Sequence, residues 1–83
     1  AAWRDEIDRL DGLLIEVLAK RMAAAEKIGL IKKSAGRAIH DEERWKALLS
    51  DRLKKASEAG LNPDLIRSIL EEIHHHSKKR QDK

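Results

Sequence analysis

One stretch of about thirty residues, from Trp3 to about Lys33, keeps a helical hydrophobic pattern with no proline. Apolar side chains recur in it at spacings of three, four or seven residues, at Trp3, Ile7, Leu10, Leu14, Val17, Ala24, Ile28 and Ile31. At ~1.5 Å per residue this helix is roughly 45 Å long. It restricts the possible folds more than any other feature, because its apolar stripe must be covered along the whole length.

The rest of the chain predicts two shorter helices. "SAGRAIH" (34–40) interrupts the pattern, and Asp41 is suited to the N-cap of a second helix. Gly60 is placed for the C′ position after that helix, Asn62 for the next N-cap, and Pro63 for the first helical position. We therefore predict an all-α fold: a single domain over residues 1–83, with helices at about 3–33, 41–58 and 63–81.

The lengths of these helices are unbalanced. The first is about as long as the other two placed end to end, so two short helices in the same chain would leave much of its stripe uncovered. Association with a second copy covers the stripe most simply, and a two-fold symmetric dimer is the commonest closed assembly. We expect a homodimeric helical bundle.

Composition excludes several classes of protein. The chain has no cysteine, which indicates a reducing, cytoplasmic setting without disulfides. No apolar run approaches the roughly 20 residues that a membrane span needs. The net charge of +3 comes from 18 basic residues interleaved with 15 acidic ones, and there are only two aromatics. This pattern favours a local anion site over a nucleic-acid surface.

Polar residues interrupt the apolar faces where apolar residues are due. Arg21 lies on the stripe of the first helix, and Lys32, eleven residues later, points the same way to within about 20°. Arg44 lies in the first turn of the second helix, and Ser77 and Gln81 continue the apolar face of the third. Snorkelling and salt bridges could explain any one of these residues. As a set, they favour a small ligand with two or more negative charges.

These residues carry a resemblance to a known family. "WRDEIDRLDGLLIEVLAKRMAAAEKIGLIKK", "IHDEER" and "SILEEIHHHSKKRQ" together resemble the all-helical class of chorismate mutases over essentially the whole chain. The combination is specific: two arginines and a lysine along the first helix, D-x-x-R at the start of the second, and S-x-x-x-Q late in the third. The resemblance implies an intertwined homodimer and the Claisen rearrangement of chorismate to prephenate, in phenylalanine and tyrosine biosynthesis, without a cofactor or metal.

The resemblance also implies the roles of individual residues. Arg21, with Arg4 of the other subunit, holds the two carboxylates of chorismate. Geometry agrees, since Arg4 lies seventeen residues before Arg21, roughly 25 Å along the helix. Lys32 and Gln81 contact the ether oxygen of the bond that breaks. The ring hydroxyl lies near Asp41, and Arg44 and Ser77 complete the polar wall.

One position departs from the family pattern. Many members carry a carboxylate directly after the D-x-x-R arginine, whereas this chain has Trp45, which we interpret as a core residue of the second helix. Some mutase domains fused to the first enzyme of the aromatic pathway resemble this "ERW" arrangement. That resemblance implies fusion to, or association with, another enzyme of the shikimate pathway.

The histidine run at residues 74–76 is not a metal site within one chain, because successive helical side chains point about 100° apart. We expect His76 and the following lysines to be solvated. Two other functions remain open: isochorismate–pyruvate lyase activity on the same fold, and a non-catalytic helical dimerisation or regulatory module.

Overall fold

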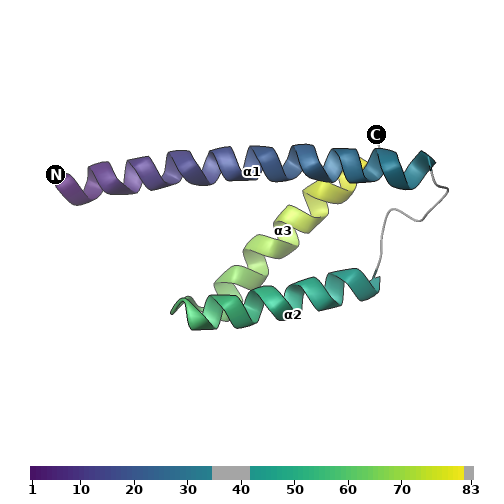
Figure 1. Ribbon diagram of the computed structural model, residues 1–83. Coiled ribbons are helices and arrows are strands. Elements are labelled where there is room, and N and C mark those ends of the chain that lie inside the picture. The colour runs from purple at the N-terminus through teal and green to yellow at the C-terminus, as the bar shows by residue number, and fades with distance from the viewer. Residues whose placement is uncertain (35–41, 82–83) are drawn as a thin grey trace.

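The computed structural model describes residues 1–34 and 42–81, with the side chain of Gln81 left out. Within these ranges the chain is three α-helices and no strand: α1 (Ala2–Ser34), α2 (Glu42–Glu58) and α3 (Pro63–Gln81) (Figure 1). The predicted all-α fold of one long and two shorter helices is confirmed. The expected break after Ser34 and the Asp41 cap lie outside the described residues.

The turn that ends α2 is set by its own sequence. Gly60 has φ 79°, a left-handed conformation that glycine adopts without steric cost. The Leu61 amide donates to the Ala56 carbonyl at 2.9 Å, and the Gly60 amide donates to the Ser57 carbonyl at 3.1 Å. These two bonds form a Schellman motif, so Gly60 is confirmed at the C′ position.

The start of α3 is capped as the sequence predicts. The side-chain oxygen Oδ1 of Asn62 accepts a hydrogen bond from the Asp64 amide at 2.8 Å. Pro63, which has no amide hydrogen to leave unpaired, occupies the first helical position. Local chemistry therefore fixes the reversal between α2 and α3.

The three helices do not share one common core. Helix α3 packs against both α1 and α2, whereas no described part of α1 packs against α2. The C-terminal end of α3 meets the C-terminal half of α1, while the N-terminal half of α1 lies away from α3 and its first turns project beyond both other helices (Figure 1). The molecule is accordingly elongated, with extents of 52 × 23 × 15 Å.

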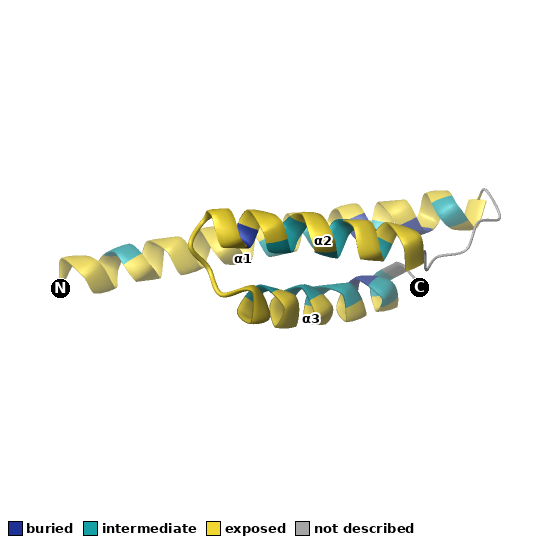
Figure 2. Cartoon of the chain, turned by 90° about the horizontal axis from the view of Figure 1, so that it is seen from below, coloured by how far each residue is buried: buried dark blue, intermediate teal, exposed yellow. Residues whose placement is uncertain are grey.

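Little apolar surface is buried within one chain (Figure 2). Among the described residues, Ala25 (6% exposed) and Ala56 (5%) are the buried hydrophobic ones. The predicted burial of the α1 stripe is not seen in the single chain. Its large members are exposed, from Trp3 at 81% to Ile28 at 46%, because the contact with α3 is centred beside the stripe, on Ala25 and Gly29. No described helix combines the length and apolar character needed to cross a membrane.

Candidate active site

The face of α1 that meets α3 carries two of the predicted cations. Arg21, Ala25, Gly29 and Lys32 follow one another at spacings of four, four and three residues, so they share one side of the helix. Ala25 and Gly29 are buried, and Arg21 and Lys32 are partly buried on either side of them. Small residues at the crossing let α3 approach closely, while the long cationic side chains border the contact.

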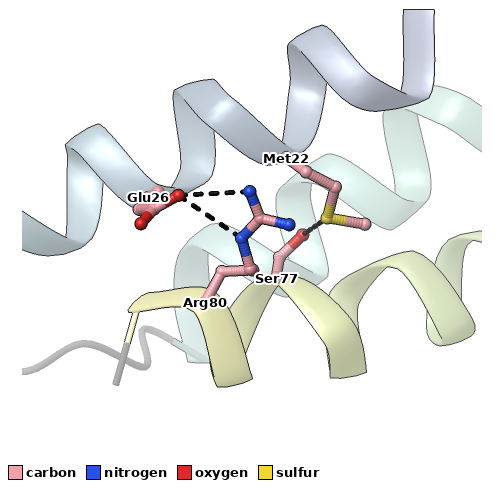
Figure 3. Close-up of polar contacts among 4 residues, drawn as sticks. All are labelled: Met22, Glu26, Ser77 and Arg80. Carbon is pink, nitrogen blue, oxygen red and sulfur yellow. Dashed lines mark hydrogen bonds and ion pairs between the residues drawn. The ribbon is translucent and has the colours of Figure 1, made fainter. Parts of the chain in front are cut away.

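Ser77 of α3 lies at this crossing. It is 7% exposed, and it is the buried polar residue among those the structure describes. Its hydroxyl accepts a hydrogen bond from Nη1 of Arg21 at 3.3 Å and donates to Sδ of Met22 at 3.7 Å (Figure 3 shows the contact with Met22). The structure therefore brings together Arg21 and Ser77, which are 56 residues apart in the sequence.

The electrostatic environment of Arg21 is positive. Burial, followed by the nearby guanidinium groups of Arg52 and then Arg44, lowers the pKa of Arg21 from its ordinary value. Both neighbours belong to α2, so positive charge from a second helix acts on the guanidinium that donates to Ser77. An arrangement of this kind favours an anionic ligand, which would relieve the repulsion.

Arg44 itself is exposed in the single chain. Its place in the polar wall of the site stays a prediction, and its charge acts on Arg21. The first turn of α2 lies at the edge of the packed region, where α1 does not cover it. Asp41, the other predicted residue at this end of α2, lies outside the described residues.

Arg52 is a neighbour of Arg21 that the sequence analysis missed. It is partly buried on the face of α2 that also carries Leu48, Leu49, Leu53 and Ala56. A signal was present, since a cation interrupts an apolar face here as it does at position 21. The signal was overlooked because the next residue, Leu53, fits the apolar periodicity expected of this helix.

Trp45 and His74 hold the start of α2 against α3. Their rings are stacked, with centroids 3.9 Å apart and an interplanar angle of 15°. Both residues are partly buried, which agrees with a packing role for Trp45. The histidine run is therefore not wholly solvated: His74 packs, whereas His76 is exposed and lies 3.7 Å from Glu72.

An ion pair fixes the last turn of α3 on α1. Nη2 and Nε of Arg80 donate to Oε2 of Glu26 at 3.1 and 3.4 Å (Figure 3). Both side chains are 42% exposed. Gln81 is the next residue and ends the helix, so this pair holds the backbone of Gln81 next to α1; its side chain lies outside what the structure describes.

Arg4 does not join this cluster. It is exposed near the start of α1, in the half of the helix that projects away from α2 and α3. One chain therefore brings Arg21 to Ser77, with Lys32 partly buried on the same side of α1, but leaves Arg4 apart. Among the described residues, no group of three or more histidine, aspartate or glutamate side chains is placed to hold a metal ion.

Comparisons with known proteins match the chain to one family and to two relatives. A family model described as chorismate mutase type II matches residues 3–82. The T-protein of Enterobacter agglomerans is 38% identical over 72 residues, which are 87% of this chain and 19% of that protein. The T-protein of Haemophilus influenzae is 40% identical over 67 residues, 81% of this chain and 18% of that protein. The chain thus spans about a fifth of the length of these relatives. No solved structure gives a significant match.

Proposed function

The chain belongs to the type II chorismate mutase family, and we propose that it catalyses the rearrangement of chorismate to prephenate in phenylalanine and tyrosine biosynthesis. The observation that carries this proposal is the crossing of α1 and α3, where Arg21 donates to the buried hydroxyl of Ser77 and Lys32 borders the same face. Chorismate is a dianion with two carboxylates and an ether oxygen, which calls for cations and neutral donors in one place.

Arg21 binds one carboxylate of the substrate. Its guanidinium offers several N–H donors in a planar fork, which matches the two oxygens of a carboxylate. The nearby guanidinium groups of Arg52 and Arg44, which lower the pKa of Arg21, also attract the dianion. They therefore strengthen the binding of the substrate at Arg21. Ser77 keeps the guanidinium in place through a neutral contact, so it does not compete with the substrate as a carboxylate would.

The reaction needs no acid–base relay, because one C–O bond breaks as one C–C bond forms within a single molecule. The site must hold the folded reactive conformer and stabilise the negative charge that grows on the ether oxygen. In our proposal Lys32 and the amide of Gln81 donate to that oxygen. The Glu26–Arg80 ion pair supports this assignment, since it holds the residue before Gln81 against the helix that carries Lys32.

Arg4 binds the second carboxylate from a partner subunit. The exposed apolar residues of the projecting half of α1 support this proposal, because a second chain that covers them brings its own α1 alongside. Each complete site then contains Arg21 of one chain and Arg4 of the other. The assembly is a homodimer with two equivalent sites.

The remaining wall of the site comes from α2. Arg44 adds positive charge, and Asp41 lies near the ring hydroxyl of the substrate. Trp45 cannot supply a carboxylate there, and its ring is already stacked on His74. Recognition of the hydroxyl in this chain therefore depends on fewer acidic groups than in family members with a carboxylate at that position, and we expect weaker catalysis than theirs.

The relatives suggest an association with a second activity. Because the chain matches about a fifth of each T-protein, most of each of those proteins lies outside the matched segment. We propose that this domain works beside another enzyme of the same pathway, either on one chain or in a complex.

The deciding experiment follows the loss of chorismate absorbance and identifies the product. We expect prephenate to form in proportion to chorismate consumed. Isochorismate is tested in parallel, and pyruvate release from it without prephenate formation from chorismate would assign a lyase instead. A dimer that turns over neither substrate would favour a regulatory or dimerisation module.

A further inference from the structure

Arg52 occupies the middle of the packed face of α2. The partly or fully buried residues of this helix are at positions 45, 48, 49, 52, 53 and 56, which is the spacing of one face of an amphipathic helix. A guanidinium there is unusual, because burying a cation is costly unless a partner or ligand compensates it.

The present partners of Arg52 leave it able to bind a ligand. Its Nη1 lies 2.6 Å from Oδ2 of Asp51, the preceding residue, in a pair whose side chains are 40% and 45% exposed. Asp51 also has Nζ of Lys55 at 3.4 Å, one helical turn away. If Arg52 turns to a bound anion, Asp51 keeps a cationic partner, so the exchange leaves no carboxylate unpaired.

The charge of Arg52 on α2 also affects the pKa of Arg21 on α1. It is the neighbouring charge with the largest effect on the pKa of Arg21, ahead of Arg44, although α1 and α2 do not pack together in the described structure. Arg52 lies on the face of α2 that also carries Trp45, which stacks on His74 of α3. Ser77, three residues further along α3, accepts a hydrogen bond from Arg21. Two cations held near each other on separate helices suit a ligand that carries more than one negative charge.

We propose that Arg52 is a third arginine of the substrate site and binds a carboxylate of the dianion in the same subunit as Arg21. This inference rests on the proposed function. It makes Arg52 a residue that determines affinity for the dianion rather than one that acts on the breaking bond. Such an interaction is the same in the bound substrate and in the transition state, so its loss raises KM and leaves kcat nearly unchanged.

The first test compares Arg52→Gln with the parent and with Arg67→Gln as a matched control. Arg67 is exposed on α3, so its replacement removes the same charge at a different place. We expect Arg52→Gln to raise KM by about tenfold, the scale of one charge-assisted hydrogen bond at a partly exposed position. The kcat should stay within about twofold, since uniform binding is what is lost. The control should change KM by less than about twofold, as expected of an exposed charge.

Two further measurements separate a carboxylate contact from a general effect of charge. Arg52→Lys keeps the charge but not the fork, so it should restore the salt dependence of kcat/KM while recovering only part of the affinity. Titration calorimetry with prephenate measures affinity for a dianion without any turnover, and Arg52→Gln should weaken that Kd by the same factor as KM. Far-ultraviolet circular dichroism checks that each variant is folded.

The outcomes distinguish this inference from the proposed function. An active parent with equal KM and equal prephenate Kd in Arg52→Gln overturns the role of Arg52 and leaves the mutase assignment intact. A parent that binds prephenate but does not turn over chorismate overturns the mutase assignment, while weaker binding by the variant still supports Arg52. Equal losses in Arg52→Gln and Arg67→Gln also overturn the inference, because net charge alone would then explain them.

Discussion

At the scale of single residues, Arg21 has the surroundings expected of the binding group that we propose it to be. Its contact within the chain is a hydroxyl, and burial together with two nearby arginines lowers its pKa. A base whose pKa is lower in the folded state than in the unfolded state opposes folding while it is charged. This cost is present at all pH values below its folded pKa, neutral pH included, and a bound dianion offsets it.

Replacing Arg21 should therefore separate activity from stability. We expect Arg21→Ala to lower kcat/KM by about 10²-fold or more, the effect of removing a preorganised charged donor. The helical circular dichroism should remain, because the fold loses one long hydrogen bond and a repelled charge. Arg21→Lys should also be poor, since a point charge does not reproduce the fork. An Arg21→Ala enzyme as active as the parent would contradict the site assignment.

Gln81 offers a test that depends on pH. In our proposal its amide donates to the ether oxygen, and a glutamate at that position can donate only when protonated. Gln81→Glu should therefore lose activity as pH rises through the glutamate pKa, because the ionised form would repel the developing charge. The measurement is kcat/KM against pH for both proteins. Superimposable profiles would argue that Gln81 does not face the reacting oxygen.

At the scale of elements, α3 organises the chain. Its first residues are fixed by the capped turn after α2, its middle is held to α2 by the Trp45–His74 stack, and its last turn is held to α1 by the Glu26–Arg80 pair. The helix that joins the other two carries Ser77 to the crossing with α1 and, in our proposal, brings Gln81 to the same site. Contacts at both ends of α3 determine where these residues lie.

The Glu26–Arg80 pair should matter more for turnover than for stability. A partly exposed ion pair contributes about 0.5–1 kcal/mol, so either single reversal, Glu26→Arg or Arg80→Glu, should lower Tm by only a few degrees. Misplacement of the adjacent Gln81 should lower kcat about threefold to tenfold, because small errors of position are costly in a preorganised site. The double reversal should recover most of both losses. A double variant as slow as the worse single one would show that the pair does not position α3.

The elements were predictable because their signals are local. The Gly60 and Asn62 caps depend on neighbouring residues only, and the interruption at Arg21 was visible as a break in periodicity. The face of α1 that meets α3 was predicted in part: Arg21 and Lys32 were expected on it, whereas Ala25 and Gly29 at its centre were not singled out. Periodicity favoured the large apolar residues over these small ones. Arg52, the Trp45–His74 stack and the Glu26–Arg80 pair depend on the relative rotation of whole helices, which local sequence does not specify.

At the scale of the whole molecule, the described chain is an incomplete unit. Its buried hydrophobic residues are two alanines, whereas large apolar side chains along α1 lie open to solvent. A core this small cannot offset the conformational entropy lost on folding. We therefore expect the long first helix to gain its stability from a partner, as in the dimer that we propose.

Mixed dimers test both the assembly and the sharing of sites. Arg4→Ala and Arg21→Ala homodimers each have two damaged sites in our proposal. A mixed dimer has one complete site, because the Arg21→Ala chain lends its intact Arg4 to the site that retains Arg21. Random pairing of an equal mixture makes about half the dimers mixed, so co-refolding should recover roughly a quarter of parental activity from two inactive samples. The measurement is prephenate formation.

Size-exclusion chromatography and a subunit-exchange assay provide the controls for this experiment. Exchange without recovery of activity would mean that Arg4 serves its own chain's site or no site. The intertwined arrangement would then have to be abandoned, although the assignment of Arg21 would stand.

The positions of the two tryptophans give the chain two separate optical reporters. Trp3 is 81% exposed on the projecting half of α1, and Trp45 lies against the imidazole of His74 at the start of α2. Indole emission moves to shorter wavelength when the ring leaves water, and a protonated imidazole quenches it. The emission of Trp3 therefore reports on the surface where a second chain would lie. The emission of Trp45 reports on the start of α2, which forms a wall of the site in our proposal. With no tyrosine in the chain, ultraviolet fluorescence comes from these two rings alone, and replacing either one by phenylalanine isolates the signal of the other.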